Sequence, residues 1–239
     1  MNETLISIPG GVPAVFRRRP NRFLLLADTA SGEEIEVHVP DPGRLKELLY
    51  QGNDLLVIPA QGNSRRTNWS LLGARDCTGW ILVNTTFHSK IARILFTGPH
   101  SPFRSVKTLR AEVTASPGRS RFDFLLNGDL WVEIKGCTLK TGNEARFPDA
   151  PTTRGVKHLM ELAEMSLRGM KAAVVFLVFV RDVDFFSPNH DADPEFAIAL
   201  QKAVEAGVAV YPVQLNFDGA EINYTKLLEL RFTRFTECF

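Results

Sequence analysis

The sequence predicts an α/β protein, α+β overall, in which a small β-barrel is followed by a layered domain with a mixed sheet. Three observations support this prediction. Short β-like runs separated by turn residues fill the first part of the chain, and helical and strand patterns alternate in the second. Hydrophobic residues make up 44% of the 239 residues, which is enough for a core and excludes intrinsic disorder. The change of pattern divides the chain into two domains, residues 1–85 and residues 86–239.

The first domain is predicted to be an OB-like barrel. One short helix, residues 43–50, is expected because Asp41-Pro42 is typical of a helix start and Gly52 of a stop. About five short strands with a helix after the third fit the small barrel that binds oligonucleotides or oligosaccharides, and other small barrels fit the same pattern. The strands are expected at residues 14–17, 23–27, 35–39, 55–58 and 80–83.

The second domain is predicted to form a mixed sheet covered by helices. Asn127-Gly128-Asp129 is typical of the tight turn of a hairpin, and Asp193-Pro194 of a helix start. The apolar run 172–180 indicates a central strand that is buried on both faces. In chain order, the expected elements are helices at 89–95 and 105–113, strands at 122–126 and 130–135, a helix at 153–170, a strand at 172–180, a helix at 193–207 and a strand at 208–215.

Composition excludes several classes of protein. The net charge is only +1, but residues 86–172 carry a net charge of +6, which a local anion-binding surface would produce. Cys77, Cys137 and Cys238 form no C-x-x-C pair, which argues against a disulfide framework or a zinc cage. The sequence has no secretory signal and no apolar run of the roughly 20 residues that span a bilayer. We therefore expect a soluble, cytoplasmic protein without a membrane partner.

The predicted hairpin carries the candidate catalytic residues. Residues two apart on a strand project to the same face, so Glu133 and Lys135 should point together. Asp123 can approach Glu133 across the hairpin, and two carboxylates at that distance repel each other unless a cation lies between them. We predict that Asp123 and Glu133 bind Mg²⁺ or Mn²⁺ and that Lys135 orients the attacking water. Glu112, at the end of the preceding predicted helix, is expected to supply a third oxygen ligand or to act through a water.

Basic and aromatic residues supply a candidate nucleic-acid surface. Arg154 and His158 are four apart and share a helix face, with Lys157 beside them. They lie at a predicted helix N-terminus, where free backbone N–H groups favour a phosphate. A polar loop offers phosphate clamps and a base-stacking platform. Its candidate residues are Arg65, Arg66 and Trp69.

Each of these features also has a simpler explanation. A Glu and a Lys two apart on a strand often form an exposed ion pair that contributes only about 0 to 1 kcal/mol. His158 alone is compatible with a packed helix residue, and Arg65 and Arg66 with solvated loop charges. The presence of Asp123 on the preceding strand of the same hairpin favours the catalytic interpretation.

Three blocks, in this order, resemble the sugar fermentation stimulation protein A family. They are HVPDPGRL at residues 38–45, the D…E-x-K hairpin followed by Thr138-Leu139, and FPDAPTTRGVKHL at residues 147–159. The resemblance spans nearly the whole chain. It implies an N-terminal OB-like barrel, a PD-(D/E)xK nuclease-like domain, and a DNA-binding protein of little or no sequence preference that is linked to sugar, especially maltose, metabolism. Arg44, in the first block, joins the candidate nucleic-acid-binding residues.

The nuclease pattern can be transferred residue by residue. It implies metal-binding acids at Asp123 and Glu133, the catalytic lysine at Lys135, and in Glu112 the acid of the first core helix. Phe122 stands where the name of the pattern expects Pro. Gly136-Cys137 follow Lys135 where a bulkier or more polar pair is expected.

Three functions are compatible with the sequence. The first is a DNA-binding protein that is also a Mg²⁺- or Mn²⁺-dependent nuclease acting through Asp123, Glu133 and Lys135. The second is a non-catalytic DNA-binding regulator of sugar metabolism that keeps only the nuclease framework. The third is a carbohydrate-binding protein, because small barrels of this type also hold oligosaccharides. The choice of DNA or RNA, the number of strands, and a monomeric or homodimeric state are left open.

Overall fold

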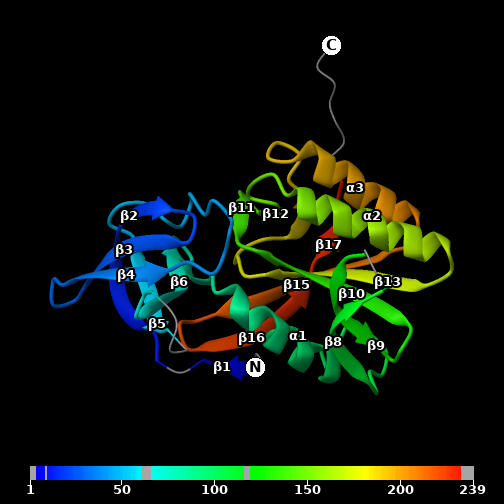
Figure 1. Cartoon of the computed structure of the whole chain (residues 1–239), viewed down its shortest axis with the longest axis horizontal. Coiled ribbons are helices and arrows are strands. Elements are labelled where there is room, and N and C mark those ends of the chain that lie inside the picture. The colour runs from blue at the N-terminus through cyan, green and yellow to red at the C-terminus, as the bar shows by residue number, and fades with distance from the viewer. Residues whose placement is uncertain (1–3, 9, 61–65, 116–118, 233–239) are drawn as a thin grey trace, which may run out of the picture.

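The chain folds into a β-barrel and a larger α/β unit that lie against each other (Figure 1). The computed structural model describes residues 4–8, 10–60, 66–115 and 119–232. The predicted architecture, an OB-like barrel followed by a mixed-sheet α/β domain, is confirmed.

The barrel is a six-stranded sheet of order β4-β3-β2-β5-β6-β7. Pairing between β4 and β6 closes it, so apolar side chains that alternate along the strands meet inside. The five predicted strands are all present, and Trp69–Asp76 was missed because this strand is nearly continuously buried rather than alternating. The strands are β2 (Val12–Asn21), β3 (Leu24–Thr29), β4 (Glu34–His38), β5 (Asp54–Pro59), β6 (Trp69–Asp76) and β7 (Gly79–Leu82).

The helix predicted over residues 43–50 was wrong. Leu48 and Leu49 donate their N–H groups to the carbonyl of Leu45, which makes a single turn. Leu45 itself has a φ of 51°, a left-handed conformation through which an α-helix cannot continue. The Leu45 N–H instead donates to the carboxylate of Asp149 at 3.0 Å, so a contact with the second domain decides the local conformation.

The second domain is built on a seven-stranded mixed sheet of order β1-β16-β15-β13-β10-β9-β8. Strand β13 is parallel to β10 and β15, and the remaining pairs are antiparallel. The strands are β1 (Thr4–Ser7), β8 (Leu109–Thr114), β9 (Arg121–Leu126), β10 (Leu130–Cys137), β13 (Lys171–Val178), β15 (Ala209–Phe217) and β16 (Glu221–Leu227). The first strand of the chain therefore lies in the sheet of the second domain.

Three helices cover this sheet (Figure 1). Helices α2 (Thr153–Leu167) and α3 (Pro194–Glu205) lie side by side on one side of the sheet, and α1 (His88–Thr97) lies on the other, after a 3-10 turn at Thr85–Phe87. Asp193 caps α3 by accepting the Phe196 N–H at 3.0 Å, as the sequence predicted. No helix within the described ranges is both long and apolar enough to cross a membrane.

The predicted helix at 105–113 was also wrong, because this segment contains strand β8. Its side chains alternate between partly buried and exposed, which is the period of a strand whose other face is open to solvent. A second sheet of order β11-β12-β14-β17, which was not predicted, completes the domain. Its strands are β11 (Leu139–Thr141), β12 (Glu144–Phe147), β14 (Phe185–Pro188) and β17 (Glu229–Leu230).

Close contacts between the two domains hold them together. The Arg181 guanidinium donates to the carbonyls of Thr78 in the barrel, at 3.1 Å, and of Phe217 in β15, at 2.5 Å. A Cβ on Gly73 would lie 3.0 Å from the Phe217 ring, so only glycine allows this approach of β6 to the second domain. These contacts set how the barrel lies against the second domain.

Candidate active site

The β9–β10 hairpin separates at the point where its carboxylates lie. Backbone pairing runs as far as Val132 opposite Phe124. One residue further, the Asp123 carboxylate accepts the Ile134 N–H at 2.6 Å and so replaces a backbone carbonyl of the ladder. The two strands are held together there by a side chain, which places Asp123 next to Glu133.

Glu133 contacts both Lys135 and His158 and so lies at the centre of the candidate site. One of its oxygens, Oε1, accepts hydrogen bonds from Lys135 Nζ at 2.5 Å and from His158 Nδ1. Lys135 and Glu133 therefore share one face of β10, as their spacing predicted. Glu133 is only 3% exposed, and its other oxygen, Oε2, has no hydrogen-bond partner among the described residues. A buried, unpartnered carboxylate oxygen is unfavourable unless a cation or water contacts it.

The two carboxylates differ in charge state. Burial, together with the negative charge of Glu133 and against the opposing effect of the Ile134 N–H, raises the pKa of Asp123 to about 7. Burial also acts to raise the pKa of Glu133, but the charge of Lys135 and the hydrogen bond from His158 outweigh it and bring that pKa below its usual value. Near neutral pH, Glu133 is therefore ionised and Asp123 is only partly ionised. A bound cation would favour the ionised form of Asp123.

The donor set fits a hard divalent cation. In the described part of the chain, no three His, Cys, Asp or Glu side chains gather closely enough to hold a metal ion alone. Asp123 and Glu133 would provide two carboxylates, and Mg²⁺ commonly binds through one or two carboxylates while it keeps several waters. The unpartnered Oε2 of Glu133 is the atom that such an ion would contact.

Glu112 does not lie on a helix, contrary to the sequence prediction. It is on strand β8, between Ala111, which pairs with Phe124, and Val113, which pairs with Phe122, and it has a φ of 56°. Its half-exposed carboxylate pairs with Arg121 Nε at 2.6 Å. Its charge still contributes to the raised pKa of Asp123. A role for Glu112 as a third ligand stays a prediction.

Helix α2 contributes the third side of the site. Thr152 caps the helix by accepting the Gly155 N–H at 3.1 Å, and this start places His158 against the hairpin. His158 is buried, and its Nε2 accepts from Arg154 Nε at 3.4 Å while its Nδ1 faces Glu133. Arg154 is thus linked to the carboxylates through one imidazole. Lys157 points to solvent, where its Nζ lies 3.7 Å from Glu161.

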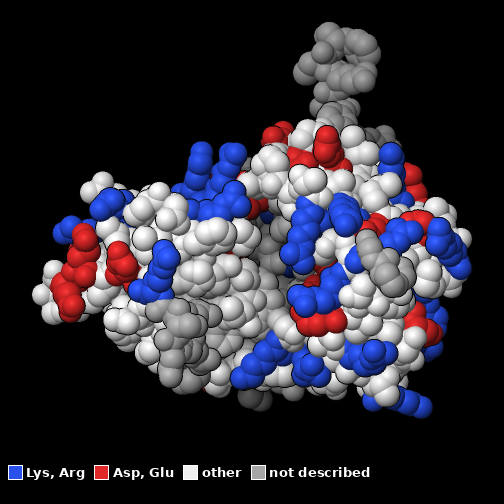
Figure 2. Space-filling view, viewed as in Figure 1, with Lys and Arg blue, Asp and Glu red and all other residues white. Residues whose placement is uncertain are grey.

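A cleft of about 510 Å³ lies between the barrel and the second domain. Asp123 and Glu133 do not line it, but Gly136, the residue after Lys135, and Arg154, which contacts His158, do. The two other sequence blocks face each other across it. Arg22, Asp41 and Arg44 line the barrel side, and Asp149 and Arg154 line the other. Figure 2 shows Lys and Arg side chains on both sides of the hollow between the domains.

Comparison with known proteins identifies the family of the chain. One family model, the sugar fermentation stimulation protein RE domain, matches residues 84–221, and a second, the SfsA N-terminal OB domain, matches residues 18–83. The chain belongs to the sugar fermentation stimulation protein family. This confirms the resemblance that the sequence blocks indicated.

Relatives in this family cover almost the whole chain. The sugar fermentation stimulation protein homolog of Methanococcoides burtonii is 40% identical, with 96% of both chains covered. That of Methanothermobacter thermautotrophicus is 46% identical, with 84% of both chains covered. A solved structure of Pyrococcus furiosus SfsA, described as a complex with Ca²⁺, has a TM-score of 0.86 and 28% identity, and the match covers 96% of this chain and 99% of that one.

The remaining predicted binding residues of this family member do not all gather at the cleft. Arg44 lines it and is exposed. Arg66 is exposed just before β6 but does not line the cleft, and Arg65 lies outside the described residues. Trp69 is partly buried and packs against the core, opposite Pro59 in the barrel sheet, so its ring is less open to a base than the sequence indicated.

The structure explains why a glycine follows Lys135, where a bulkier or more polar residue is expected. A Cβ at this position would lie 2.2 Å from Cε1 of His88, the first residue of α1. The His88 ring also stacks on Phe179, with the centroids 5.4 Å apart. Since Gly136 directly follows Lys135, this contact fixes the strand backbone that presents the lysine. No pattern in the sequence indicated this contact, because residues 88 and 136 are far apart in the chain.

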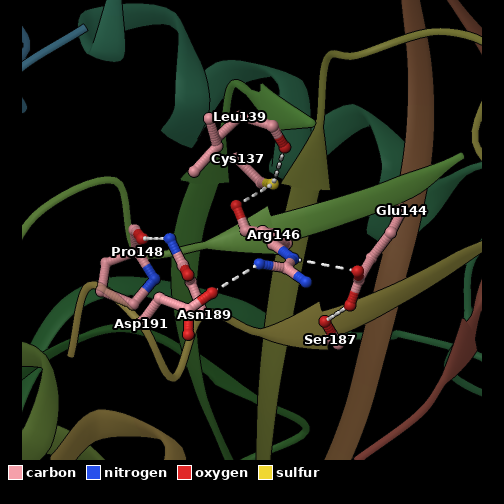
Figure 3. A network of polar contacts seen from close by, with 8 residues as sticks. All are labelled: Cys137, Leu139, Glu144, Arg146, Pro148, Ser187, Asn189 and Asp191. Carbon is pink, nitrogen blue, oxygen red and sulfur yellow. Dashed lines mark hydrogen bonds and ion pairs between the residues drawn. The ribbon is translucent and has the colours of Figure 1, made fainter. Parts of the chain in front are cut away.

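A polar network behind the cleft wall was also missed (Figure 3). The Arg146 guanidinium points between Glu144 and Asp191 and lies 2.9 Å from a carboxylate oxygen of each. Glu144 also accepts from the Ser187 hydroxyl, and Cys137 Sγ contacts the Arg146 carbonyl at 3.2 Å. Arg146 lines the cleft, but its charge is already compensated.

Proposed function

We propose that this chain binds nucleic acid, in the first place DNA, with little sequence specificity, and hydrolyses its phosphodiester bonds with a divalent cation. Asp123 and Glu133 would hold Mg²⁺ or Mn²⁺. The unpartnered Oε2 of buried Glu133 beside Asp123 carries this proposal, because a buried carboxylate oxygen without a hydrogen-bond partner among the described residues is suited to contact a cation. The Pyrococcus furiosus relative, which is described as a complex with Ca²⁺, supports it, since Ca²⁺ and Mg²⁺ both prefer oxygen ligands.

The surrounding side chains have distinct roles in this proposal. A bound divalent cation would supply Lewis acidity at the phosphate. Lys135, held by Glu133, orients the attacking water and offsets the charge that develops on the phosphate. Asp123 gives up its proton when the cation binds. Arg154, which lines the cleft and lies at the N-terminus of α2, binds the phosphate backbone of the nucleic acid to be cut.

A second candidate is a DNA-binding regulator of sugar metabolism that has the framework but does not cleave. The observation that favours it is the ion pair of Glu133 with Lys135, which already compensates one carboxylate internally. The name of the family supports a link to sugar metabolism for either candidate.

Cleavage assays on purified protein separate the two candidates. Labelled DNA and RNA are incubated with the protein in Mg²⁺, Mn²⁺ or EDTA. The nuclease proposal expects EDTA-sensitive cutting that Lys135→Ala reduces by about 10²- to 10³-fold, the usual effect of removing one group that stabilises the transition state. Lys171→Ala is the matched control, because Lys171 is an exposed lysine of the same sheet that pairs with Asp129.

The result that refutes the nuclease is binding of DNA without cutting in any cation, which leaves the regulator. Binding of maltodextrin in calorimetry, together with no binding of DNA, would refute both candidates and support a carbohydrate-binding barrel.

A further inference from the structure

An exposed aromatic ring lies next to Arg22, an arginine that lines the cleft. This residue, Phe23, directly precedes β3 in the barrel and is 50% exposed. Arg22 lines the cleft, and its guanidinium carbon lies 5.8 Å from the centroid of the Phe23 ring. We propose that the cleft binds one strand of nucleic acid, with a base stacked on Phe23 and phosphates held by Arg22, Arg44 and Arg154. This assignment rests on the proposed function and names the form of its substrate.

The charges on the two sides of the cleft are free to bind phosphate. Neither Arg22 nor Arg44 forms an ion pair with any residue that the structure describes. The third guanidinium, Arg154, contacts only the neutral acceptor nitrogen of His158. Three unpaired guanidiniums around one cleft are what a polyanion requires, because each phosphate contact releases a condensed counterion.

These guanidiniums are also held in place by the fold. Arg19 donates hydrogen bonds to the carbonyls of Arg44, at 2.7 Å, and of Arg22, at 2.6 Å. One half-buried arginine thus ties together the backbones of the two barrel segments that carry the cleft residues. A preformed site of this kind loses less conformational entropy on binding than one built from mobile loops.

The acids in the cleft leave room for sugar and base rather than for phosphate. Asp41 and Asp149 each use an oxygen to accept a backbone N–H, from Gly43 and Leu45 respectively. Burial and, to a smaller extent, the charge of nearby Asp149 raise the pKa of Asp41 to about 6. Their remaining oxygens can accept from base amino groups or sugar hydroxyls. Phosphates would therefore lie at the rim, where the guanidiniums are.

The dimensions favour one strand over two. The carboxylates to be reached are recessed, since Glu133 is buried and the Lys135 side chain is 13% exposed. The cleft volume of about 510 Å³ is within the range of small-ligand pockets, about 300 to 1,000 Å³. A stiff duplex cannot enter such a space, whereas a single strand can be drawn in with its bases unstacked onto aromatic rings.

The test measures binding in EDTA, where no cleavage interferes. Fluorescence anisotropy follows labelled oligothymidylate, oligouridylate and a blunt DNA duplex of the same length. Phe23→Ala should weaken single-strand binding by about 5- to 150-fold, the range for one base–aromatic stack. Tyr50→Ala is the matched control, because Tyr50 is a 52% exposed aromatic of the same domain whose ring, unlike that of Phe23, has no cation–π contact with a cleft arginine among the described residues.

A second pair of variants tests the charges. The double variant Arg22→Ala/Arg44→Ala should lower the slope of log affinity against log salt by about 1.4, at about 0.7 per phosphate on a single strand. Arg18→Ala, an exposed arginine of β2 outside the cleft, should leave single-strand affinity unchanged apart from a small general effect of charge. The comparison of oligothymidylate with oligouridylate shows whether the strand is DNA or RNA.

The outcomes distinguish this inference from the proposed function. If the duplex binds as tightly as the single strands and Phe23→Ala behaves like Tyr50→Ala, the single-strand assignment is overturned, whatever the cleavage assay shows. If single-strand binding depends on Phe23 but no polymer is cut in Mn²⁺, the assignment stands and the nuclease fails.

Discussion

Replacing Asp123 by Asn should stabilise the cation-free protein in mildly alkaline buffer and abolish its stabilisation by Mn²⁺. In the proposed function the buried Asp123 carboxylate binds a cation, and its ionised form lowers the stability of the cation-free protein. Asn has nearly the same shape, and its amide oxygen can still accept the Ile134 N–H that Asp123 accepts at 2.6 Å. The substitution therefore removes the charge and leaves the hairpin contact.

The magnitude follows from the pKa of Asp123. It rises from 3.8 to about 7 on folding, and three pKa units at about 1.4 kcal/mol each correspond to about 4 kcal/mol. Because the folded pKa lies above the unfolded one, this contribution is fully present below the unfolded value. The stability that the protonated Asp123 contributes is lost as the pH rises through about 7. Asp123→Asn should therefore gain up to about 4 kcal/mol over the natural protein between acid and mildly alkaline pH.

Urea denaturation in EDTA over a pH series measures this difference. Asp129→Asn is the matched control, because Asp129 is an exposed acid in the turn of the same hairpin. Mn²⁺ at a hundredfold excess over its Kd should then stabilise the natural protein by about 2.7 kcal/mol and Asp123→Asn not at all. Parallel stability curves for the natural protein and Asp123→Asn would refute the reasoning, because they would mean that the carboxylate is not desolvated.

Three further predictions concern the residues around the hairpin. Gly136→Ala should destabilise the protein by about 1 to 3 kcal/mol in urea denaturation, because its Cβ would clash with His88, and the double variant with His88→Ala should recover part of the loss. His158→Gln should weaken Mn²⁺ binding in calorimetry by about 10- to 100-fold, because Glu133 loses the partner that orients it; an unchanged affinity contradicts this role. Burial raises the pKa of the Cys137 thiol to about 12, so in a variant with the other cysteines replaced, thiol reagents should label it only after denaturation.

The candidate site shows how far sequence reasoning extends. Asp123, Glu133 and Lys135 were found because two strands and a tight turn fix which side chains share a face, and those relations are local. His158 was found as a member of a basic helix, but its contact with Glu133 was not, since it depends on how α2 packs against the sheet. Glu112 was assigned to a helix although the alternation of LRAEVT already indicated a strand.

The sequence by itself determined most of the local elements: the barrel strands other than β6, the acidic hairpin, helices α1 to α3 and the central strand β13. These follow from periodicity, turn residues and caps, whose physical causes act over a few residues. Only the tertiary structure decided the turn at Leu45, the close approach of His88 to Gly136 and the cleft that Arg22 and Arg154 both line. Each depends on contacts between segments distant in the chain, and their free energies appear only when both domains are packed.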